Sequence, residues 1–585
     1  MTQPPEGPAE GTPQAPSGAP ADAPTDAPTS DPAADSRSLL SSTAVMAAGT
    51  VVSRLSGFVR GILLAAALGV GLHADVFNIA NTVPNMLYIL LAGGVMNAVL
   101  VPQLVRAMKN DPDGGEAYTN RIMTLAGLFL AVVTVALVVG APLLMRLFLD
   151  PEFFTPELKA QRDSVIAFAR YCLPQVFFYG MFVLVGQVLN SRGRFGPMMW
   201  APIANNVVAV AVLTTYLITI GTAEGEEKSG GFTAGAEALL GLGSTLGIVV
   251  QFLVLLPYLK SAGFSYRPRF DFRGTGLGHT FRLGMWTVLF VVVNQIAYTV
   301  VVRIASSGTI GGVGRPGSSE GTGYTIYSNS FLLTMVPHSI ITVSLATAML
   351  PLLSRYAADA RLSEVGTAVS STLRSAYALV VPVAALFAVM SFDIADVIWG
   401  YGSAAADFGN FAPSLALFGI GLVLFTAHYL LLRGFYALEQ NRRVFWIQCA
   451  IAVTNIVAAL LLTRDATPAE TAPRLVIAYA CSYAVGAVIS YVMLSRTVGG
   501  LAGRRLVRFL VRLVIAVAIS AAAAWGLREA MAELVPGEGK LHAVLDLAVV
   551  GLAYLGIYLG VAKLLRISEV TDVMRLVTRR LTGKR

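Results

Sequence analysis

The sequence predicts an all-α polytopic membrane protein with about fourteen transmembrane helices. Of its 585 residues, 55% are hydrophobic and 13% are charged, whereas soluble domains carry about a quarter charged residues. Apolar stretches long enough to cross a bilayer, which takes about 20 residues, recur along the chain. Basic residues gather on every second connecting loop. These observations exclude a conventional soluble enzyme, a nucleic-acid-binding module and a coiled coil.

Residues 1–36 consist mainly of Pro, Ala, Gly, Ser, Thr and Asp and contain no aromatic residue. Such a segment cannot bury enough apolar surface to offset the entropy lost on ordering, so we expect a disordered cytoplasmic tail. The segment has neither the basic start nor the early apolar run of a signal peptide.

The hydropathy pattern divides the rest of the chain into fourteen apolar stretches, with boundaries good to several residues. They are 39–70, 76–105, 122–145, 164–189, 198–220, 234–257, 281–304, 324–352, 368–399, 411–434, 444–463, 473–495, 507–526 and 542–563. The longest pieces between them are under about 25 residues, too short for a separate soluble domain. No phosphate-binding G-x-x-x-x-G-K-[ST] motif occurs, so we do not expect ATP hydrolysis. No Ser/His/Asp constellation, H-E-x-x-H motif or pair of intramembrane carboxylates occurs either, so we expect no enzymatic activity and no cofactor.

The basic loops predict the orientation in the membrane. They follow the even-numbered stretches and carry Arg106, Lys109 and Arg121; Arg192 and Arg194; Lys260, Arg267, Arg269 and Arg273; Arg355 and Arg361; Arg442 and Arg443; Arg496, Arg504, Arg505 and Arg508; and Arg566, Arg575, Arg579, Arg580, Lys584 and Arg585. The positive-inside rule then places both termini in the cytoplasm. The net charge of +8 is therefore explained by topology, and we expect contact with membrane lipids, not nucleic acid.

Two arginines lie in the first apolar stretch, Arg54 and Arg60. An ionised residue at the bilayer centre costs about 2.5–3.5 kcal/mol, so each invites a functional interpretation. Gly57 permits a bend that would direct both guanidiniums into one cavity, and a guanidinium suits a diphosphate because it donates two parallel hydrogen bonds. Alternatively, Arg54 reaches the lipid head groups; Arg60 lies about 9 Å deeper, where this is less favourable.

The second stretch also contains polar and helix-bending residues. Asp75 at its start is either an N-cap or a cavity residue. Pro84, followed by Asn85, and the pair Gly93 and Gly94 predict a kinked helix. Kinked helices commonly line transporter cavities, so these residues are candidates for the site and its hinges.

Further candidates occur later in the chain. Arg170 lies in the fourth stretch and Arg303 at the end of the seventh. The eighth contains Asn329 and Ser330, and Pro337 predicts a kink just after them.

The three cysteines, Cys172, Cys449 and Cys481, show no paired spacing. They predict neither a disulfide framework nor a metal site.

Several motifs occur in a fixed order. They are S-R-L-S-G-F-V-R at 53–60, D-V-F at 75–77, P-N-M-L at 84–87, A-G-G-V-M-N-A-V-L-V-P at 92–102 and T-A-M-L-P-L-L-S at 347–354. In this order the chain resembles the MurJ/MviN family over about residues 38–565. That family comprises the proposed lipid II flippases of peptidoglycan synthesis, within the MOP exporter superfamily.

The resemblance implies an architecture. We expect an N-lobe over 37–260 and a pseudo-symmetric C-lobe over 261–500, each of six helices, around a central polar cavity. Two helices in 501–565 would form a groove for the polyprenyl tail, followed by a basic cytoplasmic tail over 566–585. The location implied is the bacterial cytoplasmic membrane.

The resemblance also implies a substrate site, and this chain departs from the family pattern at several of its positions. Arg54, Arg60 and Asp75 match positions that the family uses in its cavity. Tyr88 stands where well-studied members have arginine, and Asn329 and Ser330 replace an aspartate and an arginine. Gly93 stands where those members have an acidic residue. We therefore expect a less basic cavity, in which Arg170 and Arg303 are the residues available to compensate. Because 281–304 contains no carboxylate, the sodium site of some relatives is not expected.

Three functions remain open at this stage. The first is a flippase moving lipid II from the inner to the outer leaflet by alternating access. The second is transport of another polyprenyl-diphosphate-linked glycan, such as a teichoic-acid or capsular precursor, or export of cationic drugs, which would call for cavity carboxylates. The third is a non-transporting scaffold that recruits cell-wall synthesis proteins.

Overall fold

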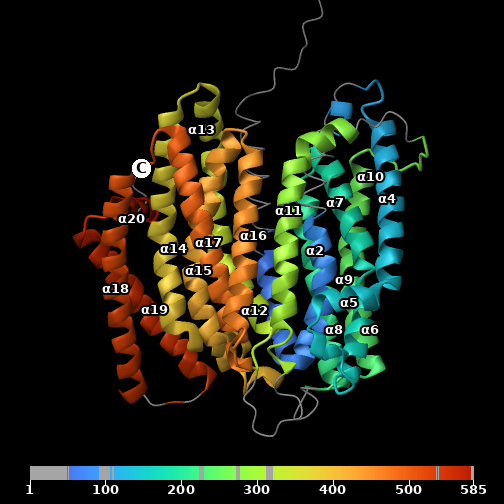
Figure 1. The fold of residues 1–585 in the computed structure, drawn as a ribbon, viewed down its shortest axis with the longest axis horizontal. Coiled ribbons are helices and arrows are strands. Elements are labelled where there is room, and N and C mark those ends of the chain that lie inside the picture. The colour runs from blue at the N-terminus through green and yellow to red at the C-terminus, as the bar shows by residue number, and fades with distance from the viewer. Residues whose placement is uncertain are drawn as a thin grey trace, which may run out of the picture.

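The computed structural model describes residues 49, 52–90, 104, 106–108, 111–222, 230–271, 277–310, 321–534, 537 and 539–581. Within these residues the fold is helical and contains no strand, which confirms the predicted class (Figure 1). An unlabelled first helix covers 52–68. The others are α2 Leu72–Ile89, α4 Glu116–Val139, α5 Ala141–Phe148, α6 Lys159–Cys172, α7 Gln175–Ser191, α8 Gly196–Thr219, α9 Ala234–Leu253, α10 Leu255–Ser261, α11 Leu277–Ala305, α12 Tyr324–Pro337, α13 Val343–Ala358, α14 Leu362–Trp399, α15 Phe411–Ala437, α16 Asn441–Thr463, α17 Thr471–Val498, α18 Gly503–Leu534, α19 Lys540–Leu564 and α20 Ser568–Leu581.

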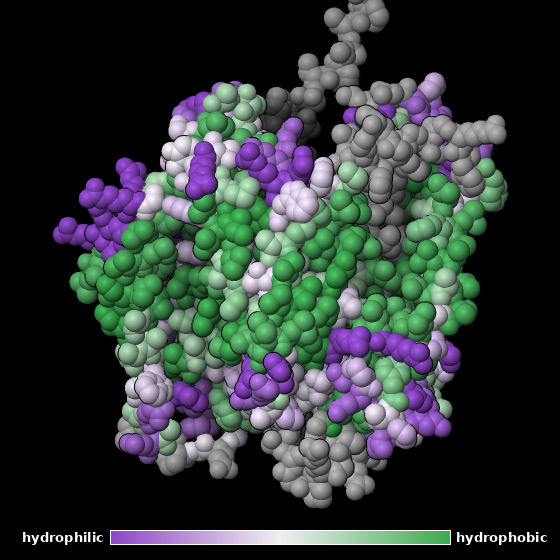
Figure 2. Space-filling view, viewed as in Figure 1, coloured by the Kyte–Doolittle hydropathy of each residue, from purple (hydrophilic) through white to green (hydrophobic). Residues whose placement is uncertain are grey.

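Twelve helices in the described part of the chain are long and apolar enough to cross a membrane. They coincide in order with the third to fourteenth predicted stretches, from Glu116–Val139 to Lys540–Leu564. The first two predicted stretches fall partly on residues outside the described ranges, as do Gly93, Gly94 and the tail over 1–36. The count of fourteen therefore stays a prediction. Figure 2 shows a hydrophobic band around this face, with hydrophilic side chains at both ends.

The helices form two groups that follow chain order (Figure 1). The amino-terminal group comprises the first helix, α2 and α4–α10; within it α2 packs on α6 and α7, and α8 on α9. The carboxy-terminal group comprises α11–α17; within it α15 lies against α14 and α17, and α11 against α16. The division at residue 260 and the pseudo-symmetry remain predictions.

The C-terminal helices α18–α20 attach to one long helix, α14. At one end of it, Arg528 Nε lies 3.0 Å from Asp393 Oδ2, and Lys540 pairs with Asp396. Further along, the buried hydroxyl of Tyr558 donates to the carbonyl of Ala378 at 2.6 Å. The pair α18–α19 is thus fixed by directed polar contacts as well as by apolar packing.

The helices bend at defined places. Directly after Pro337, the backbone forms a π-helical segment, His338–Thr342, before α13 begins. A single wide turn of this kind changes the direction of a helix and is typical of functional sites. By contrast, α2 continues through Pro84 to Ile89. Whether Pro84 and Pro337 act as hinges stays a prediction.

Residues 264–271, which follow α10, cross the end of α4. The backbone N–H of Arg267 donates to Asn120 Oδ1 at 2.8 Å, and Arg121 Nη2 lies 2.5 Å from Asp271 Oδ2. The hydrogen bond from this guanidinium lowers the pKa of Asp271 below its ordinary value.

Candidate functional site

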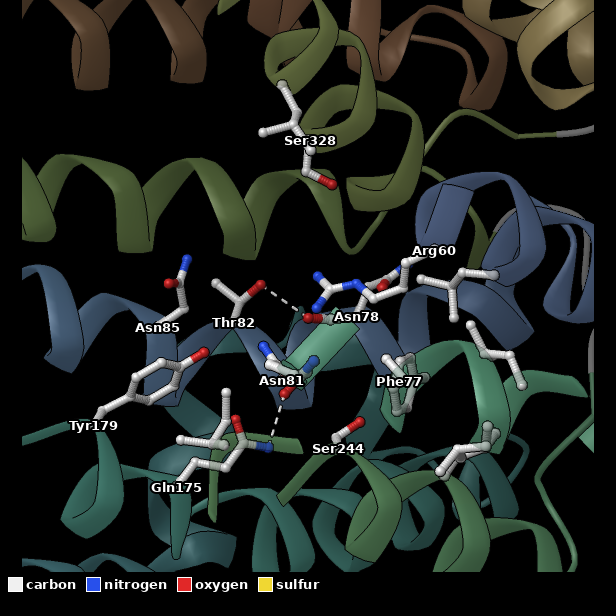
Figure 3. A pocket seen from close by; sticks show the side chains of 18 of the residues that line it. Arg60, Phe77, Asn78, Asn81, Thr82, Asn85, Gln175, Tyr179, Ser244 and Ser328 are labelled. Carbon is white, nitrogen blue, oxygen red and sulfur yellow. Dashed lines mark hydrogen bonds between the residues drawn. The ribbon is translucent and has the colours of Figure 1, made fainter. Parts of the chain in front are cut away.

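A stripe of polar side chains runs along one face of α2. Asn78, Asn81, Thr82 and Asn85 follow the spacing i, i+3, i+4, i+7, so successive turns of the helix present them on the same side. Figure 3 shows these four side chains on α2, with Ser328 of α12 facing them. In a membrane-spanning helix such a stripe is costly against lipid, and it lines a cavity here.

The cavity has a volume of about 290 Å³ and lies among the first helix, α2, α7, α8, α9 and α12. Its lining consists of Arg60, Leu64, Phe77, Asn78, Asn81, Thr82, Asn85, Gln175, Tyr179, Asn205, Ala209, Val212, Leu213, Leu240, Ser244, Ile248, Tyr324, Ser328 and Leu332. Among these residues Arg60 is the only charged one. The site therefore combines one half-buried guanidinium with neutral amides and hydroxyls.

Hydrogen bonds restrain some of the side chains that line the cavity. Gln175 Nε2 donates to Asn81 Oδ1 at 3.1 Å, and Thr82 Oγ1 donates to the carbonyl of Asn78 at 2.8 Å. In Figure 3, Arg60 reaches from the first helix toward Asn78. Because none of the described residues that line the cavity is acidic, the positive charge of Arg60 favours an anionic guest with several hydrogen-bonding groups.

At one end of the cavity α2 meets α12 through a buried carboxylate. Asp75 is 0% exposed. Its Oδ1 accepts a hydrogen bond from the backbone N–H of Thr325 at 2.7 Å. Its Oδ2 accepts from the N–H of Tyr324 and the hydroxyl of Thr309, each at 3.0 Å. Asp75 thus caps the N-terminus of α12, where the helix dipole favours negative charge.

Asp75 does not cap its own helix. The residue preceding α2 is Gly71, and no side-chain cap is present there. The interpretation of Asp75 as the N-cap of the second span is therefore wrong, because the free N–H groups that it satisfies belong to α12.

Further hydrogen bonds extend this contact between α2 and α12. We call it the α2–α12 seam, and its residues are Asp75, Asn78, Thr82, Thr309, Tyr324 and Thr325. Asn78 Nδ2 donates to Thr325 Oγ1 at 2.9 Å, and the hydroxyls of Thr82 and Tyr324 are 2.6 Å apart. At Gly323, beside the seam, a Cβ would overlap the carboxylate of Asp75. Only glycine therefore lets the start of α12 approach α2 this closely.

A family profile described as "Lipid II flippase MurJ" matches residues 64–544. The chain belongs to the MurJ family. A protein from Haemophilus influenzae named "Probable lipid II flippase MurJ" is 26% identical over 489 residues, covering 81% of this chain and 90% of the relative. One from Burkholderia cenocepacia, "Lipid II flippase MurJ", is 26% identical over 420 residues, covering 69% and 75%.

Solved structures support the same fold. The structure titled "Lipid II flippase MurJ, inward closed conformation" aligns with a TM-score of 0.66 at 14% identity, covering 88% of this chain and 98% of the other. An inward-facing multidrug resistance MATE family transporter of the MOP superfamily aligns with a TM-score of 0.59 at 16% identity, covering 77% and 95%. The fold is thus common to MurJ and MATE proteins.

For this MurJ family member, two of the residues predicted for the site line the cavity, Arg60 and Asn85. Asp75 lies in the seam. Arg54 is exposed, six residues before Arg60 on the first helix, and is not part of the lining. Gly57, between the two arginines, faces Asn206 of α8.

The remaining predicted residues lie away from the lining. Arg170 is exposed on α6, and Arg303 is partly exposed near the end of α11. On α12, Ser330 is fully buried and Asn329 partly so, while the neighbouring Ser328 lines the cavity. The structure therefore brings neither Arg170 nor Arg303 into the lining beside Arg60.

Sequence reasoning missed most of the polar lining, including Asn78, Asn81, Gln175, Asn205 and Ser244. The helical spacing of Asn78, Asn81, Thr82 and Asn85 was a usable signal, because polar residues at i, i+3, i+4 and i+7 in an apolar helix mark a solvated face. Gln175, Asn205 and Ser244 come from three other helices, and no local pattern relates them to this stripe.

Proposed function

We propose that this MurJ family member translocates lipid II from the inner to the outer leaflet of the bacterial cytoplasmic membrane. The observation that carries the proposal is Arg60, a guanidinium without an acidic neighbour in the lining of a polar cavity inside a membrane protein. Removing a charged group from water is costly unless it is paired. A diphosphate is a suitable partner, since it accepts bidentate hydrogen bonds from the guanidinium. The printed names of the relatives agree with this cargo.

In this proposal the neutral side chains of the cavity bind the rest of the cargo head. Asn81, Asn85 and Gln175 carry amide donors and acceptors that suit phosphate and sugar hydroxyl groups. The α2–α12 seam closes the cavity toward the outside. Breaking its hydrogen bonds and separating α2 from α12 would then expose Arg60 and its guest to the outer leaflet, as alternating access requires.

The orientation belongs to the same proposal. The positive-inside rule places the basic loops and both termini in the cytoplasm, which puts the α2–α12 seam toward the outer face. An inside-negative potential would favour outward movement of an anionic head, by about 2.3 kcal/mol per charge per 100 mV. The polyprenyl tail would stay in lipid beside α18 and α19. Contact with cell-wall synthesis proteins remains a prediction.

A related cargo is the second candidate, and one observation favours it. The family's additional charges are absent at Tyr88, Asn329 and Ser330, and among the lining residues that the structure describes only Arg60 is charged. A head with less negative charge, or another polyprenyl-diphosphate-linked glycan, would need fewer cations. The amides of the cavity would recognise its sugars equally well.

Purified full-length protein in liposomes tests the proposal. Fluorescent lipid II would be supplied in one leaflet, and its appearance in the other measured by a membrane-impermeant quencher. A parallel arm would use a polyprenyl-diphosphate-linked teichoic-acid precursor. We expect faster exchange of lipid II than in empty liposomes. Exchange of the teichoic-acid precursor alone would support the second candidate, and exchange of neither would overturn transport.

A further inference from the structure

A second concave and strongly charged surface lies between α14, α18 and α20, among the C-terminal helices. It encloses about 260 Å³. Its lining consists of Arg374, Arg505, Arg508, Phe509, Arg512, Arg566, Ile567, Ser568 and Glu569. None of these residues lines the central cavity, so cargo binding does not account for this pocket.

The pocket carries five guanidiniums and one carboxylate. Glu569 Oε1 is 2.8 Å from Arg374 Nε, which pairs these two residues. No ion pair within the described residues involves any of the other four arginines. Three of them, Arg505, Arg508 and Arg512, follow the spacing i, i+3, i+7 and so share one face of α18. Several unpaired positive charges therefore lie close together around one small volume. These charges repel one another unless an anion binds between them.

The opposite wall of the pocket is fixed by the turn between α19 and α20. Arg566 adopts the left-handed conformation with φ of 55°, and its carbonyl accepts a hydrogen bond from Arg512 Nη1 at 3.5 Å. Ile567 and Val570, on either side of Glu569, are almost completely buried. Packing of the turn thus sets the position of the Arg566 backbone beside α18.

The pocket also borders apolar surface that faces outward. On α18, Val507 is 60% exposed and Val511 is 53% exposed, one residue before Arg508 and Arg512 respectively. Leu564 at the end of α19 is 81% exposed. Figure 2 shows hydrophilic side chains over α18 and α20 at this edge, next to the hydrophobic band. A ligand that fills both environments has an anionic head and hydrocarbon chains.

We propose that this pocket binds the phosphate head group of an anionic phospholipid from the surrounding leaflet. The phosphate would accept hydrogen bonds from Arg505, Arg508, Arg512 and Arg566. The acyl chains of the same phospholipid would lie against the exposed valines of α18. The bound lipid would neutralise the charge between α18 and α20 and hold both helices against α14. This inference is independent of the cargo and of transport.

Native mass spectrometry of the full-length protein in detergent tests the site. Three probes would be titrated: phosphatidylglycerol, zwitterionic phosphatidylethanolamine and glycerol phosphate without acyl chains. The test variant combines Arg508→Gln with Arg512→Gln. The control is Arg504→Gln, which removes one positive charge from an exposed neighbour on α18 outside the lining, so the variants are compared per charge removed. Arg566→Gln, in the turn, gives an independent variant should the double change impair folding.

We expect one retained phosphatidylglycerol, with affinity about fivefold weaker for each pocket arginine removed and changed less than about twofold by Arg504→Gln. Equal retention of phosphatidylethanolamine would overturn selectivity for an anionic head. Equal affinity for glycerol phosphate would overturn the role of the acyl chains. An equal loss of affinity for phosphatidylglycerol in all variants, the control included, would show non-specific electrostatic attraction. That result would overturn the assignment of the binding site to this pocket. None of these readouts depends on transport, so failure of the flippase proposal would leave this test interpretable.

Discussion

The two faces of α12 differ, and so do the helix groups that they contact. One face presents Tyr324, Ser328 and Leu332 to the polar cavity of the amino-terminal group. The other presents Tyr327 and Phe331 to the carboxy-terminal group, where their rings lie 5.3 and 5.8 Å from that of Phe418. Hydrogen-bonding groups thus lie on one side of this helix, and packed aromatic rings on the other.

This difference indicates that the two helix groups have different roles. Packed aromatic side chains make a rigid interior with specific geometry, and the cluster continues from Phe418 through Tyr479 to Tyr483. The amino-terminal group instead lines a polar cavity, whose described residues combine amides and hydroxyls with the guanidinium of Arg60. We infer that the amino-terminal group supplies most contacts to the cargo head. The carboxy-terminal group holds α12 rigidly in place, where it lines the cavity and forms the α2–α12 seam.

The largest expected effect comes from removing Arg60, the one charged residue among the described residues of the cavity lining. Arg60→Ala should slow lipid II exchange about 10- to 100-fold, because a hydrogen bond to a charged group contributes about 1.5–3 kcal/mol. Liposome exchange measures the change, and thermal unfolding should be unaltered. Arg464→Gln, on an exposed turn after α16, serves as the charge-matched control. Normal exchange by Arg60→Ala would refute the assignment of the anion site to this group.

The second-largest effect is expected from a change in the α2–α12 seam. Asp75→Asn places an amide donor against the N–H groups at the start of α12, so the closed seam should lose about tenfold in population relative to the open one. A cysteine introduced at Ser328 would report this as faster labelling by an impermeant maleimide added from outside. Gly323→Ala should act in the same direction, because its Cβ overlaps the Asp75 carboxylate.

The control for the seam is Asp465→Asn, at an exposed residue after α16. It should leave maleimide labelling unchanged. If Asp75→Asn and Asp465→Asn label at equal rates, the seam does not restrain opening.

A smaller effect is expected from one neutral hydrogen bond. Asn81→Ala removes the acceptor of Gln175 and should slow exchange about threefold, as a net contribution of about 0.5–1.5 kcal/mol implies. Tyr483→Phe deletes a hydroxyl from the aromatic side and should leave exchange unchanged. The comparison between the two faces of α12 fails if the tyrosine variant is the slower one.

The smallest effect concerns Asp271, outside both groups' interiors. Because Arg121 lowers the pKa of Asp271, the pair stabilises the fold above the unfolded pKa of about 3.9 and loses this as the pH falls through the lowered value. Asp271→Asn should lower the melting temperature by at most about 2 °C at pH 7 and by nothing near pH 2. The exposed Asp359→Asn is the control; an Asp271 effect that grows in acid would contradict the pairing.

The spans were predictable because their cause is local. From Glu116–Val139 to Lys540–Leu564, each described span is an apolar run long enough to cross the hydrocarbon layer. The family was also predictable, since its motifs stand in order along the chain. The cavity was predicted only in part: Arg60 stands out as a charge in an apolar helix, whereas Asn205 and Ser244 are ordinary polar residues until α8 and α9 are brought beside α2.

The sequence alone determined the class of protein, its helices and the presence of a charged residue, Arg60, within an apolar stretch, because hydropathy and charge act on each segment separately. Only the tertiary structure decided which polar residues meet. It left Arg54 outside the cavity lining to which Arg60 belongs, and it joined Asp75 to a helix that begins at Tyr324. A hydrogen bond depends on distances in space, and packing brings together residues that lie hundreds of positions apart along the chain.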